Sequence, residues 1–141
     1  MTDLFVSPYV KVGGLVYFAR MLRKIRLQAE NRLPRDYQPF LGKGFDARTT
    51  RFLRVNYDDL VRRTLAGGTD EEVLDWCFAQ GYRPTDTEVL VWNEYMIKRG
   101  WRDTDVPPEK FRAYKEEWGL GHRADILTYF DFYEVDEGRR P

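Results

Sequence analysis

The chain has 141 residues, of which 43% are hydrophobic. Its 23 basic and 23 acidic side chains give a net charge of zero, but residues 1–66 carry a net charge of +7 and residues 67–141 a net charge of −7. This length and apolar share predict one domain with a packed core over residues 1–141, with mobile ends at 1–8 and 136–141. The single cysteine excludes an internal disulfide and zinc sites built on cysteine pairs, and the longest uncharged apolar run, Val12 to Ala19, is too short to span a membrane.

Apolar residues recur at three- and four-residue spacing over 10–25, which predicts a long first helix that ends near Asn31. Gly13 and Gly14 lie inside this pattern, and a glycine in a helix interior costs roughly 1 kcal/mol relative to alanine. Either the helix begins after the two glycines, or another backbone segment packs closely against them. No pair of strands with hairpin signals is found along the chain.

The next segments follow from turn and capping residues. Prolines and glycines predict a connecting loop over 34–44, followed by a short helix over 45–55. The segment Leu41–Gly44 precedes this helix but lacks the strand and the Lys-Ser/Thr pair of a phosphate-binding P-loop, so we interpret it as a turn. Asn56 is predicted to cap a further helix that ends at Gly67-Gly68.

Two capping boxes are the strongest structural signals in the chain. Thr69 and Thr85 are each followed three residues later by glutamate and then by an apolar run, which is typical of helix starts. The helix after Thr85 is apolar around much of its circumference, so we expect it to be the central one. Two last helices are predicted over 108–118 and 125–134, which makes the fold all-α with six or seven helices.

Residues suited to catalysis are few. The only serine, histidine and cysteine are Ser7, His122 and Cys77. A nucleophile needs a base within hydrogen-bond reach, and nothing in the sequence brings these three together. We expect Cys77 to be a core thiol and His122 to be a cap or surface residue, and we expect no metal site and no cofactor, because no His or Cys ligands have metal-binding spacing.

A polar cluster is the main candidate for a site. It follows the helix expected to be central and consists of Asn93, Arg99, Arg102, Asp103, Arg123 and Asp125. Arg102 and Asp103 are expected to form a buried ion pair with Arg123 or Asp125, which would fix the geometry of the fold. The same groups are suited to lining a small polar pocket, and we favour the structural role.

A basic face on the first helix is the second candidate. Arg20, Arg23 and Lys24 lie on that helix, near aromatic residues, which suits contact with nucleic-acid phosphates. The zero net charge argues against this, because nucleic-acid-binding domains are usually basic overall. We expect these side chains to face the acidic half of the same chain instead.

Several stretches together resemble a bacterial family known as domain of unknown function 5069. They cover nearly the whole chain in order: Gly13–Lys24, Phe45–Arg48 with Phe52-Leu53, Thr69–Trp76, Trp92-Asn93, Lys98–Asp103, and Arg123–Ile126 with Thr128, running to Asp136–Arg139. The resemblance implies a one-domain bacterial protein and transfers no activity or ligand.

Three hypotheses of function remain open. The first is a non-enzymatic, cytoplasmic helical domain whose basic and acidic segments meet internally and which presents a surface to a protein partner or to a second copy. The second is a small-molecule binder or an enzyme that uses the polar cluster. The third is nucleic-acid binding through the first helix.

Overall fold

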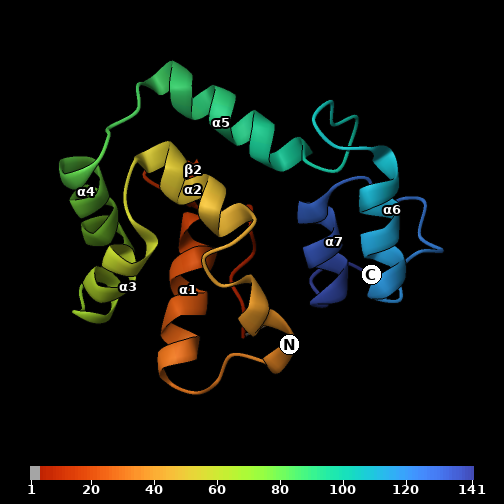
Figure 1. Cartoon of the computed structure of the whole chain (residues 1–141), viewed down its shortest axis with the longest axis horizontal. Helices are drawn as coiled ribbons and strands as arrows, with labels where there is room; N and C mark the ends of the chain where they lie inside the picture. The colour runs from red at the N-terminus through yellow and green to blue at the C-terminus, as the bar shows by residue number, and fades with distance from the viewer. Residues whose placement is uncertain (1–3) are drawn as a thin grey trace.

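Residues 4–141 are described by the computed structural model, in which a small β-hairpin leads into a bundle of helices (Figure 1). The described part holds seven α-helices, one 3-10 helix and two strands, so the predicted all-α class is confirmed. None of its helices is long and apolar enough to cross a membrane. The elements in chain order are β1 (Lys11–Val12), β2 (Leu15–Val16), α1 (Phe18–Ala29), the 3-10 helix η1 (Arg35–Phe40), α2 (Phe45–Leu53), α3 (Tyr57–Leu65), α4 (Asp70–Gln80), α5 (Asp86–Lys98), α6 (Pro108–Glu117) and α7 (Tyr129–Asp136).

The hairpin replaces the first part of the helix that the apolar spacing predicts. Strands β1 and β2 pair antiparallel, with Lys11 opposite Val16 and Val12 opposite Leu15. Gly13 and Gly14 form the turn with φ values of +55° and +82°. Two positive φ angles match the two-residue turn that joins twisted strands, and glycine adopts them without steric cost. The expectation that no strands pair was therefore wrong, and α1 begins after the two glycines.

The central helix is α1, not α5. Eight of the twelve residues of α1 are buried, and Figure 1 shows α3 and α4 on one side of it and α6 and α7 on the other. Helix α5 buries Trp92, Asn93 and Met96 but leaves Leu90 and Val91 61% and 62% exposed. The prediction failed because apolar residues around a helix show only that the helix can be buried. How much of its surface is buried depends on the number of elements that pack against it.

The predicted caps are largely confirmed. The side chain of Asn56 accepts a hydrogen bond from the backbone of Asp59, and both capping boxes, at Thr69 and Thr85, are complete. The last helix begins later than predicted, because Thr128 caps it by accepting from the Asp131 backbone at 3.1 Å. The segment 34–44, predicted as a loop, includes the short 3-10 helix η1.

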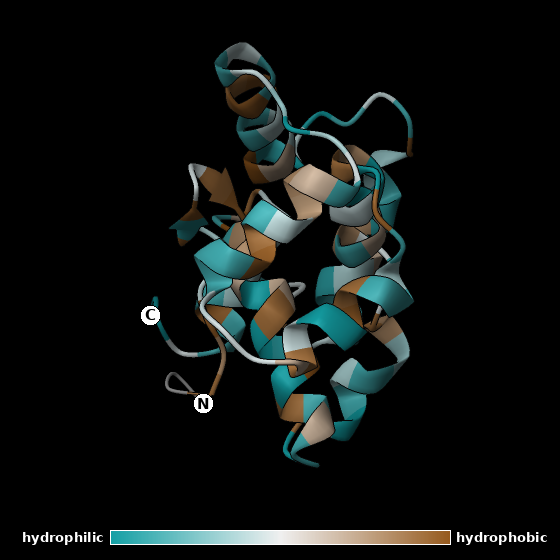
Figure 2. Ribbon diagram, turned by 90° about the vertical axis from the view of Figure 1, so that its left-hand side faces the viewer, coloured by the Kyte–Doolittle hydropathy of each residue, from teal (hydrophilic) through white to brown (hydrophobic). Residues whose placement is uncertain are grey.

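The buried residues form a main core around α1 and two smaller clusters, one between α6 and α7 and one of Phe5, Leu27 and Leu33. The two ends of the chain lie on the same side of the molecule (Figure 2), where the Arg139 side chain donates to the Phe5 carbonyl at 3.5 Å. Phe5 and Glu137 are both buried, although each lies in a segment expected to be a mobile end. Residues 1–3 of the first of these segments lie outside the described residues.

Only two ion pairs among the described residues join the two oppositely charged segments. Thirteen ion pairs join the described residues, and just Arg20–Glu137 and Arg26–Asp70 connect residues 1–66 with residues 67–141. The other pairs form within one segment. Docking of a basic half on an acidic half therefore describes a small part of the electrostatics of this fold.

Candidate functional site

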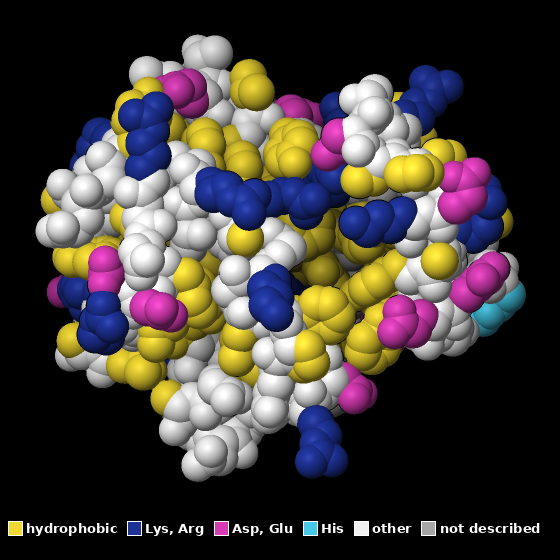
Figure 3. Space-filling view, in the orientation of Figure 1, with side chains coloured by type: hydrophobic (Ala, Val, Ile, Leu, Met, Phe, Trp, Pro, Cys, Tyr) yellow, Lys and Arg dark blue, Asp and Glu magenta, His cyan; other side chains and the backbone are white. Residues whose placement is uncertain are grey.

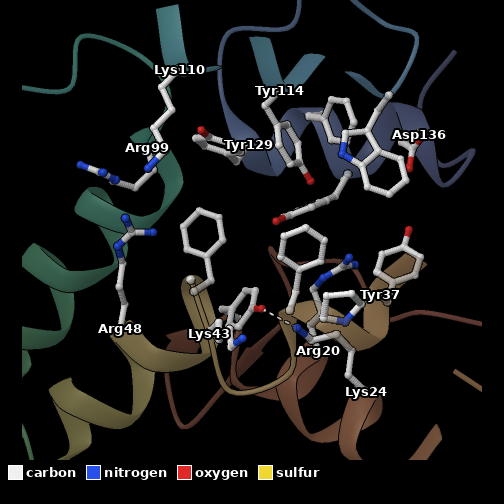
Figure 4. A pocket seen from close by; sticks show the side chains of 18 of the residues that line it. Arg20, Lys24, Tyr37, Lys43, Arg48, Arg99, Lys110, Tyr114, Tyr129 and Asp136 are labelled. Atoms are coloured by element: carbon white, nitrogen blue, oxygen red, sulfur yellow. Dashed lines mark hydrogen bonds between the residues drawn. The ribbon is translucent and has the colours of Figure 1, made fainter. Parts of the chain in front are cut away.

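A cavity of about 410 Å³ opens where α1, η1 and α2 face α6 and α7 (Figure 4). Figure 3 shows hydrophobic side chains lining a hollow, with Lys and Arg side chains across its edge. This volume is in the usual range for small-molecule sites. Six basic side chains and one carboxylate line the cavity, namely Arg20, Lys24, Lys43, Arg48, Arg99, Lys110 and Asp136.

A buried ion pair ties the C-terminal end of the chain to α1 beside this cavity. Arg20 binds Glu137 through two hydrogen bonds, Nη1 to Oε1 at 2.8 Å and Nη2 to Oε2 at 2.6 Å, and both side chains are almost fully buried. Tyr37 and Arg139 also donate to this carboxylate. Burial by itself raises the pKa of Glu137, but the hydrogen bonds and charges of the two arginines outweigh it and hold the pKa below its ordinary value.

A second buried group joins α1 to α2. The amine of Lys24 lies 2.9 Å from Oδ1 of Asp46 and donates to the Tyr17 hydroxyl at 3.0 Å, while that hydroxyl donates to Asp46 at 2.7 Å. Burial lowers the pKa of Lys24, and the Asp46 carboxylate opposes that effect. The pKa of Tyr17 lies well above its ordinary value because of burial and then the Asp46 charge. Tyr17 therefore remains a neutral donor at physiological pH.

Three of the cations that line the cavity have no carboxylate partner in residues 4–141. Lys43, Arg48 and Lys110 take part in none of the ion pairs, and the Arg48 guanidinium lies 5.2 Å from the centre of the Phe45 ring. Lys43 and Lys110 are exposed, whereas Arg48 is half-buried. These three side chains give the cavity an excess of positive charge that the protein itself does not neutralise.

Aromatic rings form most of the remaining wall. Tyr114 packs edge-on against Tyr129 and Phe132, with ring centres 5.1 and 4.9 Å apart. Burial raises the pKa of Tyr133 to about 12 and also raises those of Tyr114 and Tyr129, so these hydroxyls stay protonated at neutral pH. The indole nitrogen of Trp118 is buried without a hydrogen-bond partner among the described residues. The wall suits a flat apolar or aromatic body with a few polar atoms.

Only one residue of the predicted polar cluster lines the cavity. Arg99 is buried and bonds through Nη1 to Asp105 at 2.6 Å and, more weakly, to Asp103 at 3.3 Å. Asn93 serves the hairpin instead, since its amide accepts from the Val16 backbone at 3.1 Å and donates to the Gly14 carbonyl at 2.8 Å. Asn93 thus fastens α5 to the hairpin turn.

The other members of the polar cluster lie in separate places. Arg102 is exposed above the Trp101 ring, at 5.1 Å from its centre. Arg123 and Asp125 bind each other through two hydrogen bonds of 2.8 Å, and Arg140 joins them at 3.3 Å. No ion pair joins Arg102 or Asp103 to Arg123 or Asp125 among the described residues. Residues 123–125 belong to the loop before α7 and not to its first turn.

The basic face predicted on α1 is not exposed as a unit. Arg20 and Lys24 are buried and paired with Glu137 and Asp46, and the half-buried Arg23 donates from Nε to the Leu4 carbonyl at 2.8 Å. Arg20 does meet the acidic half of the chain, as expected, whereas Lys24 meets an acid of its own half. The charged groups of Arg20 and Lys24 therefore both form ion pairs inside the protein.

The residues suited to nucleophilic chemistry lie away from the cavity. Cys77 is fully buried in the main core, and burial raises its pKa to about 12. His122 is exposed, and neither residue lines the cavity. Within residues 4–141, no three His, Cys, Asp or Glu side chains come together as a metal-binding group.

Most of the cavity residues had no signal in the sequence. Arg48 and Lys110 are ordinary polar positions of their helices, and Tyr114 and Tyr129 are ordinary aromatic ones. The turn 41–44, interpreted as a connection, does place Lys43 and Gly44 in the wall. Three lining residues, Arg20, Lys24 and Arg99, were among the predicted candidates, and the high aromatic content of 16% was a more general signal.

Comparison with known proteins agrees with the resemblance found in the sequence. Among curated proteins, none matches the chain. The family model described as "Domain of unknown function (DUF5069)" matches residues 2–139. With nearly its whole length matched, this chain belongs to the DUF5069 family.

Proposed function

We propose that this protein is a non-enzymatic domain that binds a small organic anion in the cavity between α1, α2, α6 and α7. The observation that carries the proposal is the combination of an aromatic wall with three cations, Lys43, Arg48 and Lys110, that have no carboxylate partner in the described residues. Binding without catalysis is favoured because neither Cys77 nor His122 lines this wall.

The energetics of such a wall favour an anion over a neutral molecule of the same shape. Hydrogen bonds to charged groups contribute roughly 1.5–3 kcal/mol each, about twice as much as neutral ones. An aromatic body stacked against Tyr129 or Tyr114 buries apolar area that is worth roughly 25 cal/mol per Å². Together, the charged hydrogen bonds and the buried apolar area predict selectivity for ligands that carry both a negative charge and an aromatic body.

The double substitution Lys43→Gln with Lys110→Gln is expected to weaken the binding of 2-naphthoate about tenfold, since it removes roughly 1.4 kcal/mol of attraction. Both side chains are exposed and unpaired in the described residues, so the fold should be unaffected. Isothermal titration calorimetry measures the affinity. The neutral alcohol 2-naphthalenemethanol should bind the unmodified protein at least tenfold more weakly and respond little to the substitutions.

The matched control is Arg51→Gln with Arg112→Gln, two exposed positions on α2 and α6 that do not line the cavity. It removes the same charge and should leave the affinity unchanged. Equal binding of the acid and the alcohol, or no saturable binding of any aromatic anion, would show that the cavity is not an anion site.

A second candidate function, self-association, is favoured by the exposed face of α5. Leu90, Val91 and Tyr95 are exposed next to one another on this helix, and Val91, Trp92 and Tyr95 line a shallow groove with Phe52. We propose a second copy of the chain as the occupant. An antiparallel α5–α5 pair places the acidic first turn, with Asp86, beside Lys98 of the other copy, so the charges are complementary. The zero net charge adds no repulsion.

Val91→Glu is expected to convert a dimer to a monomer, because it places a charge at the centre of this apolar face. Light scattering after size-exclusion chromatography measures the mass. Asp75→Asn, an exposed change on α4 outside this face, is the control and should leave the mass unchanged. A monomeric unmodified protein at all concentrations, or a dimer that Val91→Glu leaves intact, would contradict self-association through α5.

A further inference from the structure

Three of the six basic side chains that line the cavity gather at one end of it. Arg48 from α2, Arg99 from the residue after α5 and Lys110 from α6 lie together, whereas Tyr37 and Asp136 lie at the opposite end (Figure 4). Asp105 and Asp103 lie 2.6 and 3.3 Å from Nη1 of Arg99, so the positive charge without a carboxylate partner at this end, among the described residues, is that of Arg48 and Lys110. Residues from three separate parts of the chain thus place basic side chains at the same end of the cavity.

Arg99 has a donor that the protein leaves unused. Its side chain is 6% exposed, and Nη1 is occupied by Asp105 and Asp103. Its Nε is buried and has no hydrogen-bond partner among the described residues. A buried donor without a partner is costly and is rare in folded proteins. Nε is covered by protein and lies out of reach of a ligand, but Nη2 of the same guanidinium also makes no hydrogen bond in residues 4–141 and is the donor open to an oxygen atom of a bound ligand.

Arg48 is the second unused group. It makes no hydrogen bond or ion pair through its side chain in residues 4–141, and the Phe45 ring lies beneath its guanidinium. Packing on a ring holds the planar group in place while its N–H donors remain available. Arg48 and Arg99 can therefore donate from two sides, with the Lys110 ammonium as a third charge.

We infer that this end of the cavity is a phosphate subsite and that the ligand is a phosphate monoester on an aromatic body. The inference rests on the proposed anion binding and names its chemical class. A phosphate monoester offers three terminal oxygens and nearly two negative charges, whereas a carboxylate offers two oxygens and one charge. Because Arg48 and Lys110 are both unpaired in the described residues, the single negative charge of a carboxylate would leave one of them without a counter-charge.

The test compares 2-naphthyl phosphate with 2-naphthoate, which share one aromatic body. Calorimetry should show the phosphate binding at least tenfold more tightly. Arg48→Gln and Arg99→Lys should each weaken the phosphate about tenfold and the carboxylate less than threefold. Arg99→Lys keeps the charge but removes the guanidinium donors, Nη2 among them, so it tests donation from Arg99 separately from its charge. Arg51→Gln, an exposed position on α2, is the control and should change neither affinity.

The outcomes separate this inference from the proposed function. If the carboxylate binds as tightly as the phosphate, the phosphate subsite is wrong and anion binding stands. If neither molecule binds, both are wrong. Tight phosphate binding that Arg48→Gln leaves unchanged places the ligand elsewhere and overturns the inference. Inorganic phosphate alone should bind more than tenfold more weakly than 2-naphthyl phosphate, and equal affinity would refute the aromatic body. If Arg99→Lys does not fold, Arg48→Gln decides the question. The Arg48 side chain makes no hydrogen bond or ion pair in residues 4–141, so this substitution should not disturb the fold.

Discussion

Glu137→Leu is expected to lower the free energy of unfolding by about 3–5 kcal/mol, because it leaves the Arg20 guanidinium buried without its counter-charge. Arg20 is 2% exposed and Glu137 1% exposed, so water cannot replace the lost partner. Tyr37 and Arg139 lose an acceptor at the same time. Urea unfolding followed by circular dichroism measures the change.

The double substitution Arg20→Met with Glu137→Leu should be less destabilised than Glu137→Leu alone, since it removes the unpaired charge. Arg62→Gln is the control, because the ion pair of Arg62 with Asp59 is exposed and such pairs contribute about 0–1 kcal/mol. The pKa of Glu137 is held below its ordinary value of 4.5, so the pair stabilises the fold above that pH and the benefit declines as the pH falls further. A loss below about 1 kcal/mol in Glu137→Leu would contradict the role of this pair.

Stability is expected to fall steeply as the pH rises above 10, the ordinary pKa of tyrosine. Burial raises the pKa of several tyrosines, among them Tyr17, Tyr114 and Tyr133, so the folded protein keeps phenol protons that the unfolded chain releases. Such groups stabilise the fold fully below the unfolded pKa, and this contribution is lost as the pH rises through the folded one. For Tyr133, whose pKa rises to about 12, the contribution is roughly 3 kcal/mol.

The ultraviolet absorbance of tyrosinate and the helix signal in circular dichroism should therefore change together in an alkaline titration. Tyr133→Phe keeps the ring and removes one of these protons, so unfolding should become less dependent on pH. Tyr95→Phe, on the exposed face of α5, should have no such effect. Complete ionisation of the tyrosines while the helices remain intact would show that their hydroxyls are not protected by the fold.

Local interactions explain which elements were predicted correctly. Asn56, Thr69 and Thr85 cap their helices within three residues of chain, so their role is readable without the rest of the molecule. The hairpin at Gly13-Gly14 was missed because its apolar residues fit a helical spacing as well as a strand. The start of α7 was misplaced because Asp125 and Thr128 are both possible caps, and Asp125 is instead paired with Arg123 and Arg140.

The candidate site depended on contacts across long stretches of sequence. Arg20 and Glu137 are 117 residues apart, and nothing local shows that they are partners. The basic character of α1 was visible, but whether Arg20 and Lys24 face solvent or the interior depends on which carboxylates the fold brings to them. Arg99 was identified as a candidate, whereas Arg48 and Lys110 became part of a site only when α2 and α6 came to face each other.

The sequence by itself thus determined the all-α class and the helix starts at Asn56, Thr69 and Thr85, because these follow from composition or from interactions a few residues apart. Only the tertiary structure decided that α1 is central, that the charges of Arg20 and Lys24 are buried, and that three unpaired cations line an aromatic cavity. These features depend on how helices pack, and the energy of packing is shared among residues from the whole chain.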